Sequence, residues 1–330
     1  MADQKLVLTF DYELFLGRNS GSVENCLIMP TREILTRLGQ HSATAIFFVD
    51  ATYLSKIETS DRQSYVKVAG QIEEMIGAGC EVGFHLHPHW LDAEKVGVDA
   101  WSLENVSKYR LHALGGGELH RVFDQSMESL AKAVARADRS YRINTFRAGG
   151  WSLQPFSNLR KLFEEFGVEC DFSVTPGLYK DSLPAHFYDY RSAPKDRVAW
   201  RFTDDPCVPR DDGRFVEVPV TAFKATLAGL VANHLRIKRQ RIFGDGQGVG
   251  EGGRLRELVR KAFSAERLRQ LTLDMCSREM LEKSLRETAG RSVRIFASHP
   301  KILSHASLDN LDYLLRQYKT LRSTEILRYA

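Results

Sequence analysis

The sequence predicts an α/β protein in which helices cover a mainly parallel sheet, folded as one barrel-like domain. Predicted strands and helices alternate along most of the chain, which is typical of parallel sheets. The length of 330 residues lies within the range of a single α/β barrel with insertions. Ionisable residues follow several predicted strands, where parallel α/β proteins gather their functional groups. We therefore expect a functional site at the C-terminal ends of the strands.

The first half of the chain has the clearest strand and helix patterns. Residues 5–10 form a short apolar run that ends at Asp11, which is typical of a buried parallel strand. Residues 61–78 repeat apolar side chains at helical spacing and end among glycines, which indicates an amphipathic helix. The same criteria predict strands at residues 45–49, 81–85, 143–146, 168–172, 215–220 and 293–297, and helices at residues 30–38, 118–135, 153–166 and about 308–318.

Two segments interrupt this alternation. Residues 175–214 have poor periodicity and several prolines, which predicts a long, partly irregular loop. Residues 222–289 have a helical pattern broken by the glycine-rich stretch 244–253, and they carry many Lys and Arg residues. We interpret residues 1–330 as a single domain with a basic helical insertion at about 222–289. This insertion is either a solvated hairpin or a lid whose cations meet a phosphate-bearing substrate or an anionic membrane surface.

Composition limits the class of protein. Hydrophobic residues make up 43% of the chain and charged residues 27%, which is typical of globular proteins. The five cysteines are scattered without a Cys-x-x-Cys pair, which argues against a disulfide framework or a zinc ribbon. The N-terminus leads directly into a predicted strand and no apolar run reaches membrane-spanning length, so we expect a soluble, cytoplasmic protein. No aromatic stacking pattern accompanies the net charge of +4, so we expect no nucleic-acid partner, and the oligomeric state stays open.

Three of the ten histidines lie within five residues, in the stretch from Glu81 to Trp90. Side chains alternate along an extended backbone, so His85, His87 and His89 would project from one face, with Pro88 ending the strand. Histidine is the commonest metal ligand, and a catalytic zinc usually has three protein ligands and one open position. The stretch therefore predicts a metal site. The alternative is an aromatic strand end that faces solvent, with which the same residues are consistent.

Several short motifs at predicted strand ends resemble those of the polysaccharide deacetylase family. In chain order they are Thr9-Phe10-Asp11-Tyr12-Glu13, Glu81-Val82-Gly83-Phe84-His85 followed by His89, Phe146-Arg147-Ala148-Gly149-Gly150-Trp151, Cys170-Asp171-Phe172-Ser173 and Ala297-Ser298-His299-Pro300. The family's NodB-like homology domain is a distorted (β/α) barrel that acts on acetamido sugars. The resemblance extends from near Lys5 to near Leu327, apart from the insertion. It therefore implies this barrel, with a helical insertion added.

The resemblance also implies the acid and base residues. Asp11 occupies the place of the family's catalytic base, and Arg147 that of the arginine which holds the base. A carboxylate beside a guanidinium stays ionised and oriented, as a base must. His299 corresponds to the general acid that protonates the departing amine, and Asp171 to the partner of that histidine.

The same resemblance implies a divalent metal, for which we expect zinc because it suits mixed imidazole and carboxylate ligands. His85 and His89 correspond to the family's two metal-binding histidines. Tyr12 replaces the aspartate that supplies the family's third ligand. Glu13 shares a face with the base in an extended strand, so we predict Glu13 as the third ligand. The alternatives are Asp11 and His87.

We therefore predict a metal-dependent hydrolase that removes an N-acetyl group from an amino sugar in a precursor of a bacterial surface polysaccharide such as an O-antigen. The sugar could be phosphate-linked, given the basic insertion. A second hypothesis is an amidohydrolase of a cyclic imide, ureide or formamido compound, suggested by the change to Tyr12. A third is a carbohydrate-binding member that has lost its activity.

Overall fold

The computed structural model describes residues 4–98, 100–182, 186–237, 243–248 and 268–330. One sheet contains, in spatial order, β10 (Trp200–Phe202), β11 (Phe215–Glu217), β7 (Cys170–Asp171), β6 (Thr145–Ala148), β3 (Glu81–Leu86), β2 (Ile46–Asp50), β1 (Lys5–Tyr12) and β14 (Val293–Ser298). A ninth strand, β15 (Lys319–Thr320), pairs with the start of β1. Neighbouring strands are parallel except β10 and β11, so the predicted parallel sheet is confirmed.

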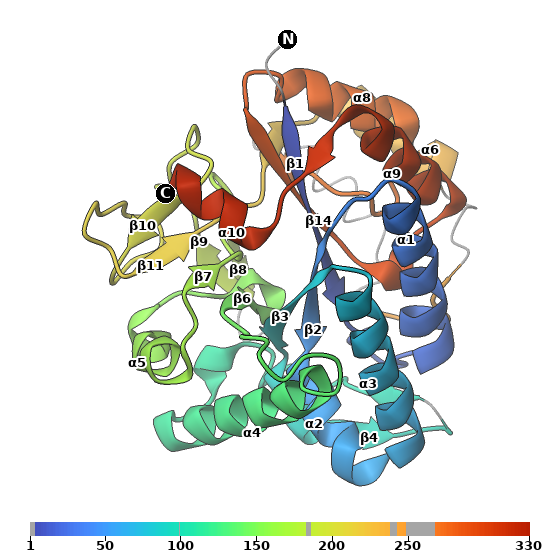
Figure 1. The fold of residues 1–330 in the computed structure, drawn as a ribbon, viewed down its shortest axis with the longest axis vertical. Coiled ribbons are helices and arrows are strands. Elements are labelled where there is room, and N and C mark those ends of the chain that lie inside the picture. Colours follow the sequence, from blue (N-terminus) through green and yellow to red (C-terminus); the bar gives the residue numbers. More distant parts are fainter. Residues whose placement is uncertain (1–3, 99, 183–185, 238–242, 249–267) are drawn as a thin grey trace.

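Helices surround this sheet. They are α1 (Met29–Gln40), α2 (Ala51–Ser60), α3 (Arg62–Gly77), α4 (Gly116–Val134), α5 (Ser157–Phe166), α6 (Leu227–Ile237), α8 (Arg278–Glu287), α9 (His305–Gln317) and α10 (Ser323–Ile326). Figure 1 shows α1, α3 and α9 along one side of the sheet and α5 on the other. Helix α2 was not predicted, because Asp50 both ends β2 and caps the helix, accepting a hydrogen bond from Tyr53 N at 3.2 Å. No loop residues separate the two elements.

Strand β3 lies close against both of its neighbours. A Cβ atom at Gly83 would come within 2.6 Å of the Phe48 ring and 2.7 Å of Thr145 Oγ1, which is closer than real Cβ contacts. Phe48 belongs to β2 and Thr145 to β6, so only glycine fits between these strands. This close packing fixes the strand two residues before His85.

Residues 220 and 221, which follow β11, connect the two sides of the sheet through single hydrogen bonds. Val220 N donates to Val174 O, just after β7, at 2.9 Å, and Thr221 N donates to Ile295 O of β14 at 3.0 Å. Leu271 extends this connection, because Ala297 N donates to its carbonyl oxygen at 3.0 Å. The sheet therefore curls into the distorted barrel that the sequence predicted.

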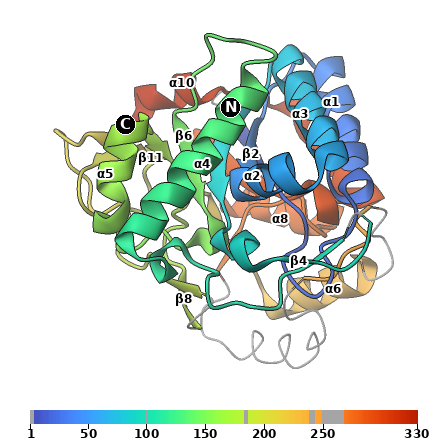
Figure 2. The ribbon, with the colours of Figure 1, turned by 90° about the horizontal axis from the view of Figure 1, so that it is seen from below.

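The two irregular segments contain more strand than expected. Strands β8 (Tyr179–Ser182) and β9 (His186–Asp189) form a hairpin inside the predicted loop, and β10 also lies there. Inside the predicted helical insertion, β12 (Ala222–Lys224) pairs with β13 (Leu268–Gln270), while α6 and α8 are helical as expected. A last pair joins β4 (Glu94–Lys95) to β5 (Trp101–Ser102). Seen from below, β8 and α6 both lie at the lower edge of the molecule (Figure 2).

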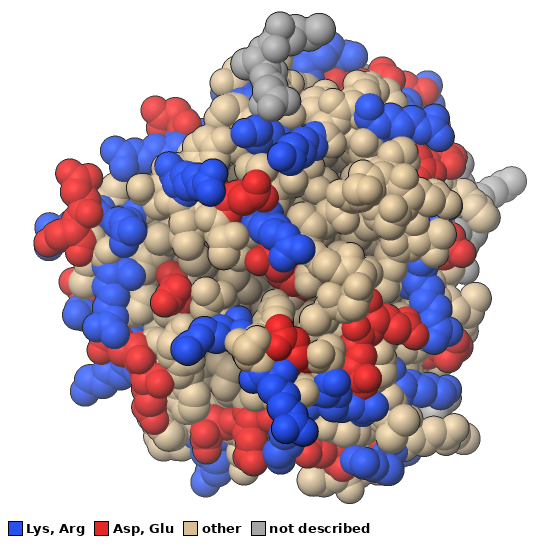
Figure 3. Space-filling view, in the orientation of Figure 1, with Lys and Arg blue, Asp and Glu red and all other residues tan. Residues whose placement is uncertain are grey.

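On the face shown in Figure 3, acidic and basic side chains are interspersed. Within the insertion, Arg236 pairs with Glu279 at 2.7 Å. Lys224, also in the insertion, is exposed at the end of β12. The remaining basic residues that suggested a lid lie outside the described residues: Lys238, Arg239, Arg241, Arg254, Arg256, Arg260 and Lys261. Among the described residues, no helix has the length and apolar character to cross a membrane.

Candidate active site

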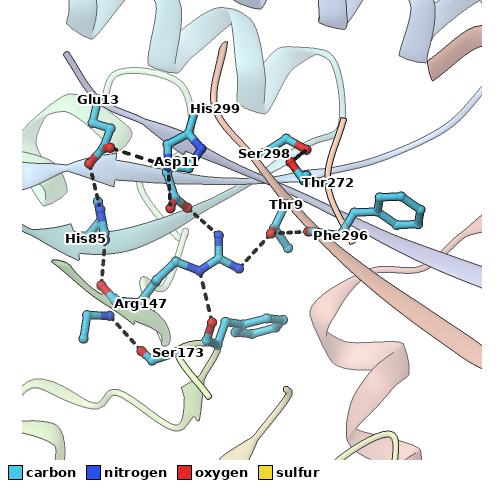
Figure 4. A network of polar contacts seen from close by, with 12 residues as sticks. Thr9, Asp11, Glu13, His85, Arg147, Ser173, Thr272, Phe296, Ser298 and His299 are labelled. Atoms are coloured by element: carbon cyan, nitrogen blue, oxygen red, sulfur yellow. Dashed lines mark hydrogen bonds and ion pairs between the residues drawn. The ribbon is translucent and has the colours of Figure 1, made fainter. Parts of the chain in front are cut away.

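The ends of four parallel strands meet at one cavity of about 220 Å³. Asp11 lies near the end of β1, His85 in β3 and Arg147 in β6, and His299 follows β14. Three of these four predicted residues, Asp11, His85 and His299, line the cavity directly. Arg147 lies fully buried beneath it and contacts Asp11 (Figure 4). The cavity wall also includes Glu13, His87, Tyr109, Ala148, Gly150, Trp151, Lys180, His186, Tyr188 and Gln270.

Glu13, His85 and His87 bring three ligand atoms to one point. Glu13 Oε2 lies 3.1 Å from His85 Nε2 and 2.6 Å from His87 Nε2, and the two imidazole nitrogens lie 3.0 Å apart. All three side chains are buried. Two imidazoles and a carboxylate form the donor set that divalent transition metals prefer. This group of residues could therefore hold a metal ion.

The orientation of both histidines fits such a site. His85 Nδ1 lies 2.7 Å from the carbonyl oxygen of Arg147, and because that oxygen can only accept, Nδ1 carries the hydrogen. Its other nitrogen, Nε2, faces Glu13 and is the atom that would bind a metal, as in metal-bound histidines that donate their other N–H to a backbone carbonyl. Gly149 packs against the His87 ring, and a Cβ atom there would lie 2.9 Å from His87 Nδ1. Backbone packing therefore holds the ring in place.

His89, a predicted ligand, lies away from this group in the structure. Its ring stacks on Tyr109 with centroids 4.9 Å apart, and neither ring nitrogen has a hydrogen-bond partner. Burial lowers its pKa to about 3. The physical reason is a change of backbone: His87 is still extended, but a 3₁₀ turn begins at Pro88. Two-residue alternation therefore places His85 and His87 together, and the turn carries His89 elsewhere.

Asp11 is held by Arg147. One guanidinium nitrogen, Nη1, donates to Asp11 Oδ1, while Nη2 donates to Thr9 Oγ1 at 2.7 Å and Nε to Phe172 O at 3.1 Å. Burial alone would raise the pKa of Asp11, but the charges of Arg147, His85 and His299 outweigh it and leave the pKa below its usual value. Asp11 is therefore ionised, as a base requires, and Oδ2 remains directed toward His299.

A lysine that the sequence analysis did not single out completes the environment of Glu13. Lys301 Nζ donates to Glu13 Oε1 at 2.7 Å and to Leu14 O at 2.6 Å, and Lys301 is buried. Burial would raise the pKa of Glu13, but Lys301 and His87 lower it well below its usual value. One carboxylate oxygen thus faces the lysine and the other faces the two histidines.

The partner of His299 is Asp274, not the predicted Asp171. His299 Nδ1 lies 2.6 Å from Asp274 Oδ2, and its backbone N–H donates to Asp274 Oδ1 at 2.8 Å. Burial favours the neutral imidazole, but the Asp274 carboxylate outweighs it and raises the pKa of His299. Asp171 lies in the core and binds Ser173 instead. Residue 274 lies in the segment with a helical pattern, where the one local signal for it is a carboxylate soon after the short strand β13.

The second ring nitrogen of His299, Nε2, faces the carboxylates of Asp11 and Glu13. Its Nε2 lies 3.5 Å from Asp11 Oδ2 and 3.6 Å from Glu13 Oε1. The arrangement thus places an ionised carboxylate, an imidazole with a raised pKa and a group of potential metal ligands at one wall of the cavity. Such a set can move protons to and from a bound substrate.

Comparisons with known proteins identify the fold. No protein-family model matches the sequence, and no curated protein matches it significantly. A provisionally assigned polysaccharide deacetylase from Mycobacterium smegmatis aligns over 99% of this chain and 90% of its own, with 13% identity and a TM-score of 0.52. A 4-alpha-glucanotransferase from Thermococcus litoralis aligns over 100% of this chain and 41% of its own, also with 13% identity and a TM-score of 0.52. The chain therefore has the NodB-like deacetylase fold that its motifs predicted, and because a glucanotransferase shares it, the fold does not decide the reaction.

Proposed function

We propose that this protein is a metal-dependent hydrolase that removes the acetyl group from an N-acetylated amino sugar. The observation that carries this proposal is the position of His299 Nε2, 3.5 Å from the carboxylate of Asp11 and next to the group of Glu13, His85 and His87. Amide hydrolysis needs a base for the attacking water and an acid for the departing amine, because an unprotonated amine is a poor leaving group.

The residues divide the reaction between them. Asp11 takes a proton from the water that attacks the amide carbon, and Arg147 keeps Asp11 ionised and directed at that water. His299, protonated and held by Asp274, gives its proton to the amide nitrogen as the carbon–nitrogen bond breaks. The products are acetate and the free amino sugar.

Glu13, His85 and His87 would hold the metal, and Lys301 would fix the second oxygen of Glu13. A bound divalent metal lowers the pKa of its water toward neutrality and polarises the amide carbonyl. We propose zinc, because a site of two imidazoles and one carboxylate with an open position is typical of catalytic zinc.

The charges of the site favour amide hydrolysis over cleavage of a glycosidic bond, the chemistry that a glucanotransferase name implies. Glycoside cleavage uses two carboxyl groups, one of which is protonated and acts as the acid. Among the described residues of the cavity wall, the carboxyl groups are Asp11 and Glu13, and cations hold the pKa of each below its usual value. The available acid is a histidine, which suits an amine leaving group.

We further propose that the substrate is a phosphate-linked precursor of a surface polysaccharide such as an O-antigen. Lys180 on the wall of the cavity supports an anionic substrate, since an ammonium group attracts phosphate. Three aromatic side chains on the same wall, Tyr109, Trp151 and Tyr188, provide apolar faces for a sugar ring.

Acetate release tests these proposals. The purified protein, loaded with zinc and analysed for metal content, is incubated with free, nucleotide-linked, lipid-linked and polymeric N-acetylated sugars, and with a cyclic imide. We expect acetate from at least one phosphate-linked sugar and none from the Asp11→Asn variant. Turnover of the imide alone would establish the amidohydrolase hypothesis instead. Stoichiometric zinc without turnover of any substrate would contradict both.

A further inference from the structure

Two carboxyl groups that take no part in the proposed chemistry lie side by side beneath the site. Asp171 belongs to β7 and Glu217 to β11, and the two residues are paired in the register of these strands. Both are completely buried. Two ionised carboxylates in contact without water would repel each other strongly, so one of them is expected to hold a proton.

The hydrogen bonds around the pair identify the protonated partner. Asp171 accepts two hydrogen bonds from Ser173, from N–H at 2.8 Å and from the hydroxyl at 2.7 Å, so both of its oxygens act as acceptors. Glu217 accepts one hydrogen bond, from Val174 N at 3.1 Å on Oε1. Its Oε2 is buried and has no donor directed at it. A proton on Oε2 would satisfy this atom by a hydrogen bond to Asp171.

This pair supports the segment that holds Arg147. Ser173, which is bound to Asp171, accepts a hydrogen bond from Ala148 N at 2.8 Å (Figure 4). The neighbouring carbonyl of Phe172 accepts from Arg147 Nε at 3.1 Å. Residues 172–174 thus lie between the carboxyl pair and Arg147, and their position sets the direction of the guanidinium toward Asp11.

We infer that Glu217 is an uncharged acid whose proton bridges to Asp171, and that this pair is a positioning element for Arg147. The inference gives Asp171 a role that is separate from the acid His299. It concerns the same Arg147 and Asp11 that the proposed function uses, so its effect on catalysis rests on that function. The existence of the bridging proton does not depend on the proposed function.

The surroundings of the pair favour this protonation state. Burial and the Asp171 charge raise the pKa of Glu217 well above its usual range, and burial also raises the pKa of Asp171. Arg147 favours ionised Asp171, and the other ionisable side chains that interact with the pair among the described residues include Cys170, Cys207 and Tyr190, none of which supplies a positive charge. Arg147 therefore favours a negative charge on Asp171 and leaves the proton on Glu217.

This protonation state has a consequence for folding. The unfolded chain ionises Glu217 at its ordinary pKa, whereas the folded chain keeps the proton, so stability from this group is complete at low pH and is lost as pH rises. Glu217→Gln removes the titration. Its amide can still donate to Asp171 and accept from Val174, so all the hydrogen bonds are retained. Glu217→Ala removes the donor, so Asp171 loses the hydrogen bond from residue 217.

Three variants of the full chain test the inference. We expect Glu217→Gln to keep kcat within about twofold of the native enzyme. As pH rises from 5 to 8, the free energy of unfolding of this variant should also increase relative to that of the native chain. Ser173→Ala, which breaks the link to Ala148, and Glu217→Ala should lower kcat at least about 10-fold with KM nearly unchanged, because Arg147 loses its fixed direction.

Infrared difference spectra of native protein minus Glu217→Gln provide a readout that needs no substrate. They should contain the carbonyl band of a protonated carboxyl group at pH 7. If this band is absent, or if Glu217→Gln loses stability in parallel with Glu217→Ala at every pH, the bridging proton does not exist. If the band is present but Ser173→Ala keeps full activity, the positioning role is wrong. A chain without deacetylase activity would still give the spectra and the unfolding curves, so failure of the proposed function is distinguishable.

Discussion

The carbonyl oxygen of Arg147 lies 2.7 Å from Nδ1 of His85. The side chain of the same arginine donates to Asp11, so one residue of β6 orients a candidate metal ligand with its backbone and the candidate base with its guanidinium. A substitution at position 147 alters the side chain and keeps the carbonyl. Metal binding and base function can therefore be separated by mutation.

Replacing Arg147 with Met should raise the pKa of Asp11, because burial then acts without its largest opposing charge. The base must be ionised, so the acidic limb of the pH–rate profile should move to higher pH. Activity at pH 7 should fall about 100-fold or more, which is within the usual contribution of a general base. Metal content should stay at the native level. Arg147→Lys, which keeps a positive charge, is the control and should shift the profile less, whereas an unshifted profile in Arg147→Met would show that Asp11 is not the base.

The matched variants His87→Ala and His89→Ala decide which histidine completes the metal site, and Glu13→Gln tests the carboxylate ligand. His87→Ala and Glu13→Gln should lose bound metal, by more than the roughly 10- to 100-fold in affinity that outer partners contribute. His89→Ala should keep metal, because its ring stacks on Tyr109 outside the group. Metal analysis after dialysis measures both. Metal retained without His87 but lost without His89 would support the ligand spacing of the deacetylase family instead.

The sequence predicted those parts of the site that depend on local pattern. Asp11, His85 and His299 follow or end apolar strands, and in a parallel sheet the ends of such strands meet. The choice between His87 and His89 was not local in this sense. It depends on where the extended backbone gives way to a 3₁₀ turn, and Pro88 permits that change without fixing the direction of the neighbouring rings.

Contacts that form where the barrel closes could also not be predicted from the sequence. Asp274 reaches His299 because residues 271–274 follow β13 and run beside the end of β14, yet this strand of three residues lies in a segment with a helical pattern. Lys301 is a buried cation whose partner is 288 positions away. Neither pairing leaves a periodic signal, since each depends on how distant strands curl together.

Removing the acid should separate chemistry from metal binding. His299→Ala should lower kcat by about 100- to 10,000-fold while metal stays bound, since His299 is outside the group of potential ligands. Asp274→Asn should act differently. Asp274 raises the pKa of His299, so without its charge the imidazole loses its proton at lower pH and the alkaline limb of the pH–rate profile moves down. An alkaline limb that stays in place in Asp274→Asn would mean that another group supplies the proton.

Lys301 gives the last prediction, which concerns stability. Glu13 is buried, and its pKa is low because Lys301 and His87 outweigh the effect of burial. A carboxyl whose pKa is depressed in the folded state stabilises the protein above its unfolded pKa, and this stability is lost as pH falls through the folded value. Lys301→Met removes the largest of the opposing charges. The pKa of Glu13 should then rise, and the free energy of unfolding of the metal-free protein at pH 7 should fall by about 3 kcal/mol, as when one partner of a buried ion pair is removed.

The double variant Glu13→Gln/Lys301→Met is the control for this prediction, because it removes the buried charge together with its partner. It should recover much of the lost stability, and its unfolding should depend less on pH between 4 and 7. Denaturant titrations of the native chain, both single variants and the double variant give the coupling energy of the pair. If the double variant is no more stable than Lys301→Met alone, Lys301 stabilises the protein through its contact with Leu14 O rather than through Glu13.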